Sequence, residues 1–207
     1  MDCLLQTRLL AIVRTTVTGM IPGIVETLAQ SGVRAVEIAL GEPGALTAIR
    51  AIAKRDIPGL LLGAGTVLNV DTAAAAFDAG ATYLVSPAVI PEVIHFAALR
   101  DAAVFPGAYT ATEILTAISL GAPGVKLFPA SAGGPGYVNA LLGPLPFAQL
   151  LPTGGVTLES IPDYLNSGAF AVAIGSPLIR DADSTGDLDA LAARAHTAVR
   201  LARGAPL

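Results

Sequence analysis

Glu37 and Lys126 are the two residues whose types and positions could do chemistry together. Each interrupts an apolar run, Glu37 in Arg34–Leu40 and Lys126 in Gly124–Pro129. Lysine and glutamate are rarely buried without a partner or a chemical role. A neutral lysine amine can condense with a ketone, and the resulting iminium stabilises the carbanion left when a neighbouring carbon–carbon bond breaks. A carboxylate within reach can carry the protons that such a reaction moves.

The alternation of side chains along a strand predicts where these two residues point. The large apolar residues on the other face of the two runs are Val36, Ile38, Leu40, Val125 and Leu127. If that face packs against helices, Glu37 and Lys126 point to the inner side, Lys126 together with Phe128. One interpretation is a reactive lysine beside a proton-transfer carboxylate, with burial and a cation such as Arg14 favouring the neutral amine. The other is a structural ion pair between Lys126 and Glu37.

Two glycine-containing turns could bind an anion. Thr153-Gly154-Gly155 and Gly175-Ser176 each follow an apolar run, and glycine lets backbone N–H groups approach a phosphate closely. The alternative is that these glycines only form tight turns. His95 and His196 lie in helical stretches, where an exposed helix position accounts for them better than a zinc site does.

Eight rounds of an apolar, strand-like run followed by an Ala/Leu-rich helical stretch must position these residues. The expected strands are Leu9–Arg14, Arg34–Leu40, Gly59–Thr66, Tyr83–Pro87, Ala103–Ala108, Gly124–Pro129, Gln149–Gly154 and Ala171–Ser176. The helices are expected to centre near Ile24, Ala48, Ala75, Ile94, Leu115, Val138, Ile161 and Leu191. Several helices end in a glycine that suits a C-cap, namely Gly32, Gly80, Gly121 and Gly168.

Eight alternating units in 207 residues predict an α/β fold, a (β/α)₈ TIM barrel forming a single domain over residues 1–207. An open, doubly wound sheet is the structural alternative, but Arg14-Thr15-Thr16 stands where the dinucleotide fingerprint G-x-G-x-x-G would follow the first strand. In a barrel, catalytic groups lie at the carboxyl ends of the strands. The residues expected there are Arg14, Glu37, Thr66, Ser86, Pro106, Lys126, Thr153, Gly175 and Ser176.

Composition excludes several classes of protein. The chain is 53% hydrophobic and 14% charged, which argues against disorder, and its net charge of -4 gives no basic footprint for nucleic acid. We find no cleavable signal, no run long enough to cross a membrane, and one cysteine, Cys3, which cannot form a disulfide within the chain. We therefore expect a soluble, cytoplasmic protein.

Taken in order, the strand-end motifs resemble those of the 2-keto-3-deoxy-6-phosphogluconate / 2-keto-3-deoxy-6-phosphogalactonate aldolase family. The resemblance covers nearly the whole chain. Its motifs are Ala35-Val36-Glu37-Ile38, Gly63-Ala64-Gly65-Thr66-Val67-Leu68, Val85-Ser86-Pro87, Pro106-Gly107, Val125-Lys126-Leu127-Phe128-Pro129-Ala130, Pro152-Thr153-Gly154-Gly155-Val156 and Gly175-Ser176. Each piece is weak alone, but their order and spacing together are specific.

The resemblance implies a class I aldolase that needs no metal or other cofactor and releases pyruvate and glyceraldehyde 3-phosphate from a phosphorylated keto acid. Lys126 matches the family's Schiff-base lysine, and Glu37 its general acid/base, which acts through a water. The matching binding residues are Arg14 and Thr66 for the carboxylate end, Pro87 and Phe128 for the pyruvate pocket, and Gly154, Gly155, Gly175 and Ser176 for the phosphate. Members of the family are usually homotrimers.

The motifs combine features of the two epimer types. Gluconate-type enzymes have an arginine at the position of Gly41; it is absent here, as in the galactonate type. The segment Ser131–Tyr137 also resembles the galactonate type. Thr153 instead resembles the gluconate type, since the galactonate type tends to have valine there. The resemblance leaves the configuration at C4 of the substrate open.

Three other functions compete with an aldolase. A sugar-phosphate epimerase or isomerase on a similar barrel would not need an inward Lys126. A non-catalytic sugar-phosphate-binding protein would not need both Lys126 and Glu37. A metal-dependent pyruvate aldolase would need a ligand set that the sequence does not make evident.

Overall fold

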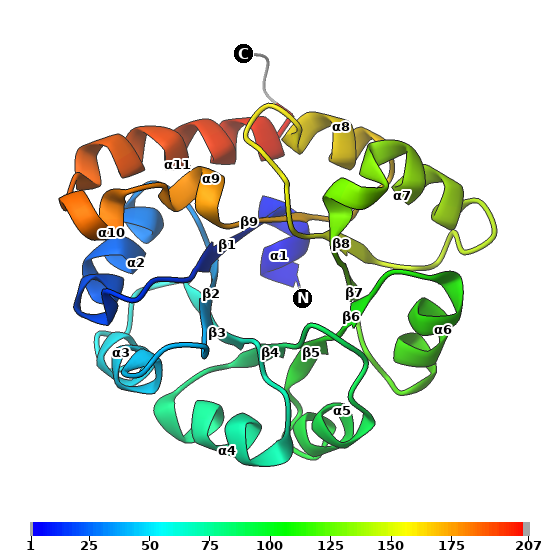
Figure 1. Cartoon of the computed structure of the whole chain (residues 1–207), viewed down its shortest axis with the longest axis horizontal. Coiled ribbons are helices and arrows are strands. Elements are labelled where there is room, and N and C mark those ends of the chain that lie inside the picture. Colours follow the sequence, from blue (N-terminus) through cyan, green and yellow to red (C-terminus); the bar gives the residue numbers. More distant parts are fainter. Residues whose placement is uncertain (1, 205–207) are drawn as a thin grey trace.

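The computed structural model describes residues 2–204, except for the side chains of Asp2, Cys3 and Leu5, so the statement about Cys3 lies outside the described residues. Parallel strands form a central ring and helices surround it, which confirms the (β/α)₈ barrel (Figure 1). The strands are β1 (Leu9–Val13), β2 (Ala35–Ala39), β3 (Leu61–Gly65), β4 (Tyr83–Val85), β5 (Ala103–Phe105), β6 (Gly107–Ala108), β7 (Val125–Leu127), β8 (Leu150–Pro152) and β9 (Val172–Ile174).

The helices alternate with these strands, and all eight expected helices are present, as α2 to α8 and α11. The described helices are α1 (Asp2–Thr7), α2 (Ile21–Gln30), α3 (Ala45–Ala53), α4 (Val70–Ala79), α5 (Pro91–Ala98), α6 (Ala111–Ser119), α7 (Gly134–Leu142), α8 (Ile161–Asn166), α9 (Ser176–Ile179), α10 (Ala182–Thr185) and α11 (Leu188–Ala202), with 3-10 turns η1 (Thr18–Met20) and η2 (Ala130–Ala132). The four glycines expected at helix ends all have positive φ, between 94° and 104°. Among residues 2–204, no helix combines the length and apolar character that crossing a bilayer requires.

The ring consists of two hydrogen-bonded arcs. One has the order β5-β4-β3-β2-β1-β9 and the other β6-β7-β8. The fifth expected strand, Ala103–Ala108, is therefore wrong as a continuous element: it pairs with β4 before Pro106 and with β7 after it. Proline has no N–H to donate to a ladder, so the strand breaks there. On the other side, a bridge between Thr153 and Ala173 links β8 to β9.

Two apolar layers hold the barrel together. The outer layer lies between strands and helices and includes Val36, Ile38, Val125 and Leu127. The inner layer fills the barrel and includes Leu4, Tyr83, Phe105, Leu151 and Phe170. The predicted directions of the strand side chains are thus confirmed, because the large neighbours of Glu37 and Lys126 all belong to the outer layer.

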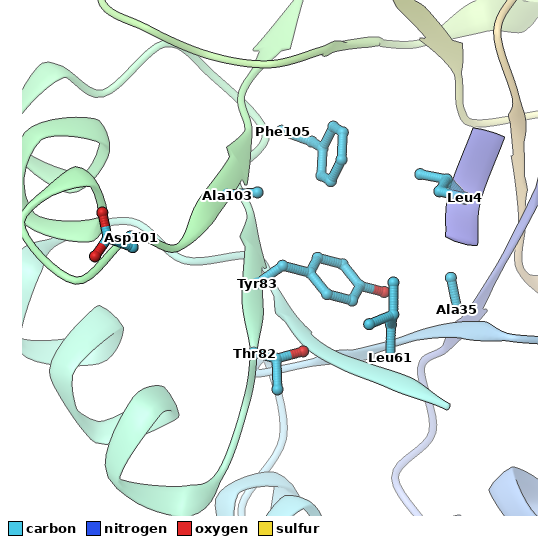
Figure 2. Close-up of a pocket in the computed structure, with 8 residues that line it drawn as sticks. All are labelled: Leu4, Ala35, Leu61, Thr82, Tyr83, Asp101, Ala103 and Phe105. Atoms are coloured by element: carbon cyan, nitrogen blue, oxygen red, sulfur yellow. The ribbon is translucent and has the colours of Figure 1, made fainter. Parts of the chain in front are cut away.

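The amino end of the barrel is closed by apolar side chains. Figure 2 shows Tyr83 and Phe105 pointing from β4 and β5 toward Leu4 of α1, around a small cavity of about 180 Å³. The rings of Tyr83 and Phe105 meet edge to face, and Phe105 stacks on Phe170. Helix α1, which the sequence did not predict, covers this end with Leu4, which is 2% exposed.

Candidate active site

A cavity of about 660 Å³ opens at the carboxyl ends of the strands. It is lined by Ile12, Arg14, Glu37, Thr66, Pro87, Lys126, Phe128, Thr153, Gly154, Gly155, Val156, Ala173, Gly175, Ser176 and Pro177. Every residue to which the sequence assigned a catalytic or binding role is among them. Two other expected strand-end residues are not: the hydroxyl of Ser86 is buried and donates to the Ala88 carbonyl oxygen at 2.7 Å, and Pro106 divides β5 from β6.

Lys126 reaches this cavity from the middle of β7. Lys126 is 7% exposed, and its Nζ lies 5.1 Å from the centre of the Phe128 ring, a cation–π distance. Neither Lys126 nor Glu37 forms an ion pair with a described residue; the pair of Arg55 and Glu26 lies on the surface. The structural Lys126–Glu37 ion pair that the sequence left open is therefore not formed, and the amine faces the cavity without a bound carboxylate.

Glu37 enters the same cavity from β2, on the opposite arc of the barrel. It is 2% exposed and makes no hydrogen bond or ion pair with a described residue. Burial raises the pKa of its carboxyl above the ordinary value, while the positive charges of Lys126 and Arg14 oppose this with a smaller effect. A carboxyl with a raised pKa exchanges protons closer to neutral pH, which suits a general acid/base.

Arg14 and Thr66 form a fixed pair at one side of the cavity. Arg14 Nη2 donates to Thr66 Oγ1 at 2.9 Å. Thr66 has a φ of 61°, which is rare for a β-branched residue and occurs where surrounding structure imposes it. A Cβ added to Gly41 would lie 3.4 Å from Arg14 Nη1, so Gly41 leaves the guanidinium room beside the barrel mouth. The remaining guanidinium donors can bind a carboxylate.

Two glycine turns present unused backbone donors at the other side. The N–H groups of Gly154, Gly155, Gly175 and Ser176 make no hydrogen bond with the described residues. Gly154 and Gly155 have φ of 86° and 80°, and a Cβ there would meet the Phe128 ring at 2.9 Å and the Ser131 side chain at 2.4 Å. Only glycine fits both positions, and the free N–H groups form a concavity suited to an anion.

Thr153 lies between the lysine and these turns and is 3% exposed. Its Oγ1 donates to the Leu151 carbonyl oxygen at 2.9 Å. Because the hydroxyl hydrogen is used in this way, Thr153 offers a ligand the lone pairs of its oxygen. It can therefore accept a hydrogen bond from a substrate hydroxyl.

Sequence reasoning missed four lining residues, Ile12, Val156, Ala173 and Pro177. The alternation rule would have found Ile12 and Ala173, since both are inward positions near the carboxyl ends of β1 and β9. It also missed Arg194, whose guanidinium donates to the carbonyls of Leu178 and Ile179 at 2.7 and 3.0 Å and so ties α11 to α9. No sequence pattern indicates that contact.

The described residues contain no group of three His, Cys, Asp or Glu side chains placed to hold a metal ion. His95 and His196 are exposed on α5 and α11, as the simpler interpretation of the sequence expected. The ionisable groups in the cavity are Arg14, Glu37 and Lys126.

Comparison with known proteins gives consistent matches over most of the chain. The family model for KDPG and KHG aldolase matches residues 1–193. A probable 2-dehydro-3-deoxy-6-phosphogalactonate aldolase of Rhizobium meliloti is 36% identical over 87% of this chain and 85% of its own. A 2-dehydro-3-deoxy-phosphogluconate aldolase of Pseudomonas aeruginosa is 39% identical over 77% of this chain and 73% of its own. The solved structure described as native KDPGal superposes with a TM-score of 0.88 and 34% identity, covering 95% of this chain and 94% of its own.

Proposed function

The chain belongs to the KDPG and KHG aldolase family, and we propose that it cleaves a 2-keto-3-deoxy-6-phospho sugar acid to pyruvate and D-glyceraldehyde 3-phosphate through a Schiff base on Lys126. The observation that carries this proposal is the inward Lys126 amine, which has no carboxylate partner and shares one cavity with the buried Glu37. A structural lysine would be paired, whereas a nucleophile must be free to attack.

In the proposed reaction, Lys126 Nζ attacks the C2 ketone of the substrate and loses water to form an iminium. The C3–C4 bond then breaks: its electron pair moves into the iminium to give an enamine, and the C4 hydroxyl loses its proton to Glu37 through a bridging water. C4 leaves as the aldehyde of glyceraldehyde 3-phosphate. Glu37 returns a proton to C3, and hydrolysis of the imine releases pyruvate and the free lysine.

The cavity supports one orientation of the substrate. The Arg14–Thr66 pair binds the carboxylate at C1, while Pro87 and Phe128 flank the three carbons that become pyruvate. The free N–H groups of Gly154, Gly155, Gly175 and Ser176 receive the phosphate. Thr153 lies between these ends, at the level of the C4 hydroxyl. We propose that both C4 epimers are cleaved.

The test uses the fact that the sequence contains two lysines, Lys54 and Lys126. The protein is incubated with pyruvate, reduced with borohydride and mapped by mass spectrometry, and pyruvate release is assayed with each C4 epimer. We expect the adduct on Lys126 in the wild type and in Lys54→Arg, and neither adduct nor turnover in Lys126→Met. The proposal would be rejected by labelling at Lys54, or by a wild type in which no lysine is labelled and neither epimer is cleaved. Either result would favour another phosphate-binding barrel protein.

We further propose that residues 1–207 form one domain and that the protein acts in the cytoplasm. We also propose that it is a homotrimer, because the family resemblance implies that assembly. Sedimentation equilibrium should then give three times the chain mass of 20.8 kDa. A concentration-independent mass of one chain would contradict the trimer without affecting the proposed chemistry.

A further inference from the structure

Strand β3 carries two glycines that face the inside of the barrel, Gly63 and Gly65. The neighbouring residues Leu62 and Ala64 belong to the outer apolar layer. A Cβ added to Gly65 would lie 1.7 Å from Glu37 Oε1, and one added to Gly63 would lie 2.2 Å from the Tyr83 ring. Each glycine therefore leaves a space that a larger side chain from an adjacent strand fills.

The two spaces serve opposite ends of the barrel. The β2–β3 register pairs Glu37 with Gly63 and Ala39 with Gly65, so the Glu37 side chain leans toward the carboxyl end and lies over Gly65. Tyr83 pairs with Gly63 from β4, and its ring occupies the space at the amino end beside Leu61 (Figure 2).

Packing is what positions the Glu37 carboxylate. It makes no hydrogen bond or ion pair with any described residue, although it is almost fully buried. The described polar groups thus do not fix its rotamer. A Cβ on Gly65 would overlap the carboxylate, so a methyl group there would remove the position that the carboxylate occupies.

We propose that Gly65 is a positioning residue that holds the Glu37 carboxylate in reach of C3, the carbon next to the imine carbon bonded to Lys126. Gly63 makes the corresponding space for the ring of Tyr83, where its role is structural. This inference rests on the proposed function, since it concerns the proton-transfer step of the same site. The two glycines lie two positions apart on one strand, so each is a matched control for the other.

The two alanine variants should fail in different ways. In Gly65→Ala the clash involves only the Glu37 side chain, from Cγ to Oε1, among the three nearest atoms. That flexible side chain can rotate from χ1 into the cavity, so the fold should persist. In Gly63→Ala the clash is with a ring held edge to face against Phe105, so the barrel must shift. Gly65→Ala should lose proton transfer with little loss of stability, and Gly63→Ala should lose stability but keep proton transfer in the folded protein.

The experiment measures two steps separately with pyruvate alone. Borohydride trapping reports the imine, and deuterium exchange of the pyruvate methyl group, followed by NMR in D₂O, reports proton transfer. Gly65→Ala should trap pyruvate like the wild type but exchange on the order of 10²-fold more slowly, the effect of misplacing a reacting group by about 1 Å. Gly63→Ala, assayed below its melting temperature, should exchange at the wild-type rate.

A double-mutant cycle identifies the group through which Gly65 acts. In the Glu37→Gln background, Gly65→Ala should slow exchange little further, because the carboxylate it displaces is already gone. Wild-type exchange in Gly65→Ala, or an equal further loss in the Glu37→Gln background, would overturn the inference. If the wild type itself neither traps pyruvate nor exchanges its protons, the proposed function fails instead.

Discussion

Glu37 combines a chemical role with a cost to stability. Burial raises the pKa of its carboxyl, so the folded protein disfavours the ionised form relative to the unfolded chain. The cost is fully present above the raised folded pKa, and it disappears as pH falls below the ordinary unfolded value of about 4.3. A neutral amide of the same shape removes the charge at every pH.

We therefore expect Glu37→Gln to unfold at a higher denaturant concentration than the wild type at pH 7, and to exchange pyruvate methyl protons about 10²–10⁴-fold more slowly. The stability difference should shrink as pH is lowered toward 4. Denaturant titrations at several pH values and NMR exchange rates measure the two effects. A variant less stable than the wild type at pH 7 would show that the carboxylate stabilises the barrel.

The Glu113 carboxylate should stabilise the fold, the opposite of the effect expected for Glu37, so Glu113 serves as the control. Hydrogen bonds from Thr110 and Tyr109 lower the pKa of its carboxyl at the start of α6. That stabilisation is present above the unfolded pKa and is lost as pH falls through the lowered folded value. Glu113→Gln should therefore reduce stability at pH 7, with a difference that shrinks in acid, and should leave methyl exchange unchanged.

Thr153 is the residue through which the orientation of the C4 hydroxyl can be distinguished. Its own hydrogen is donated to Leu151, so it accepts from the substrate, and a valine of the same shape cannot. Losing one such hydrogen bond costs about 0.5–1.5 kcal/mol, up to roughly tenfold in rate. We expect Thr153→Val to shift the kcat/KM ratio toward the galactonate epimer by up to that factor. If the wild type cleaves only one epimer and Thr153→Val leaves the kcat/KM ratio unchanged, another residue selects the configuration at C4.

At the scale of elements, α9 carries part of the proposed phosphate site, and its end is held by a contact with α11. The guanidinium of Arg194 on α11 donates to the carbonyls of Leu178 and Ile179, at the far end of α9 from Ser176. Loss of this contact should loosen the turn at Gly175. We expect Arg194→Met to raise KM for the phosphorylated substrate about tenfold, since charge-assisted hydrogen bonds are worth about 1.5–3 kcal/mol, while pyruvate trapping is retained.

Arg8 is the matched control for Arg194. Its guanidinium also donates to backbone carbonyls, but to that of Leu165 in α8 and to those of Ala169 and Phe170 just before β9. Arg8→Met should lower the melting temperature without a specific rise in KM for the phosphorylated substrate. If both variants raise KM equally, Arg194 acts through general stability and does not position α9.

The elements that the sequence predicted are those with a repeating local signal. Alternation in Arg34–Leu40 and Gly124–Pro129 correctly placed Glu37 and Lys126 on the inner face, and the glycine ends of the helices were located well. The break at Pro106 was missed because the apolar run continues through it, although its missing N–H was visible in the sequence. Arg194 and Gly65 could not be assigned, because their contacts join positions far apart in the chain.

The whole molecule separates stability from chemistry along the barrel axis. Its amino end is filled by the inner apolar layer with Leu4, Tyr83, Phe105 and Phe170, and its carboxyl end holds the open cavity with the charged residues. This division is general in barrels of this kind, where loops at the carboxyl end vary with the reaction. A change at the amino end should thus alter the free energy of unfolding and leave the site intact.

Leu4→Ala tests this separation. Leu4 is 2% exposed and packs into the inner layer from α1, and truncating a buried leucine costs about 2–5 kcal/mol. Leu99→Ala removes the same atoms from a side chain that is 84% exposed, so its stability should change by less than about 0.5 kcal/mol. Denaturant titration should separate the two variants, while their kcat/KM at low temperature, normalised to folded protein, should equal that of the wild type. A fall in kcat/KM for Leu4→Ala alone would mean that packing at the amino end reaches through the inner layer to the groups around Lys126.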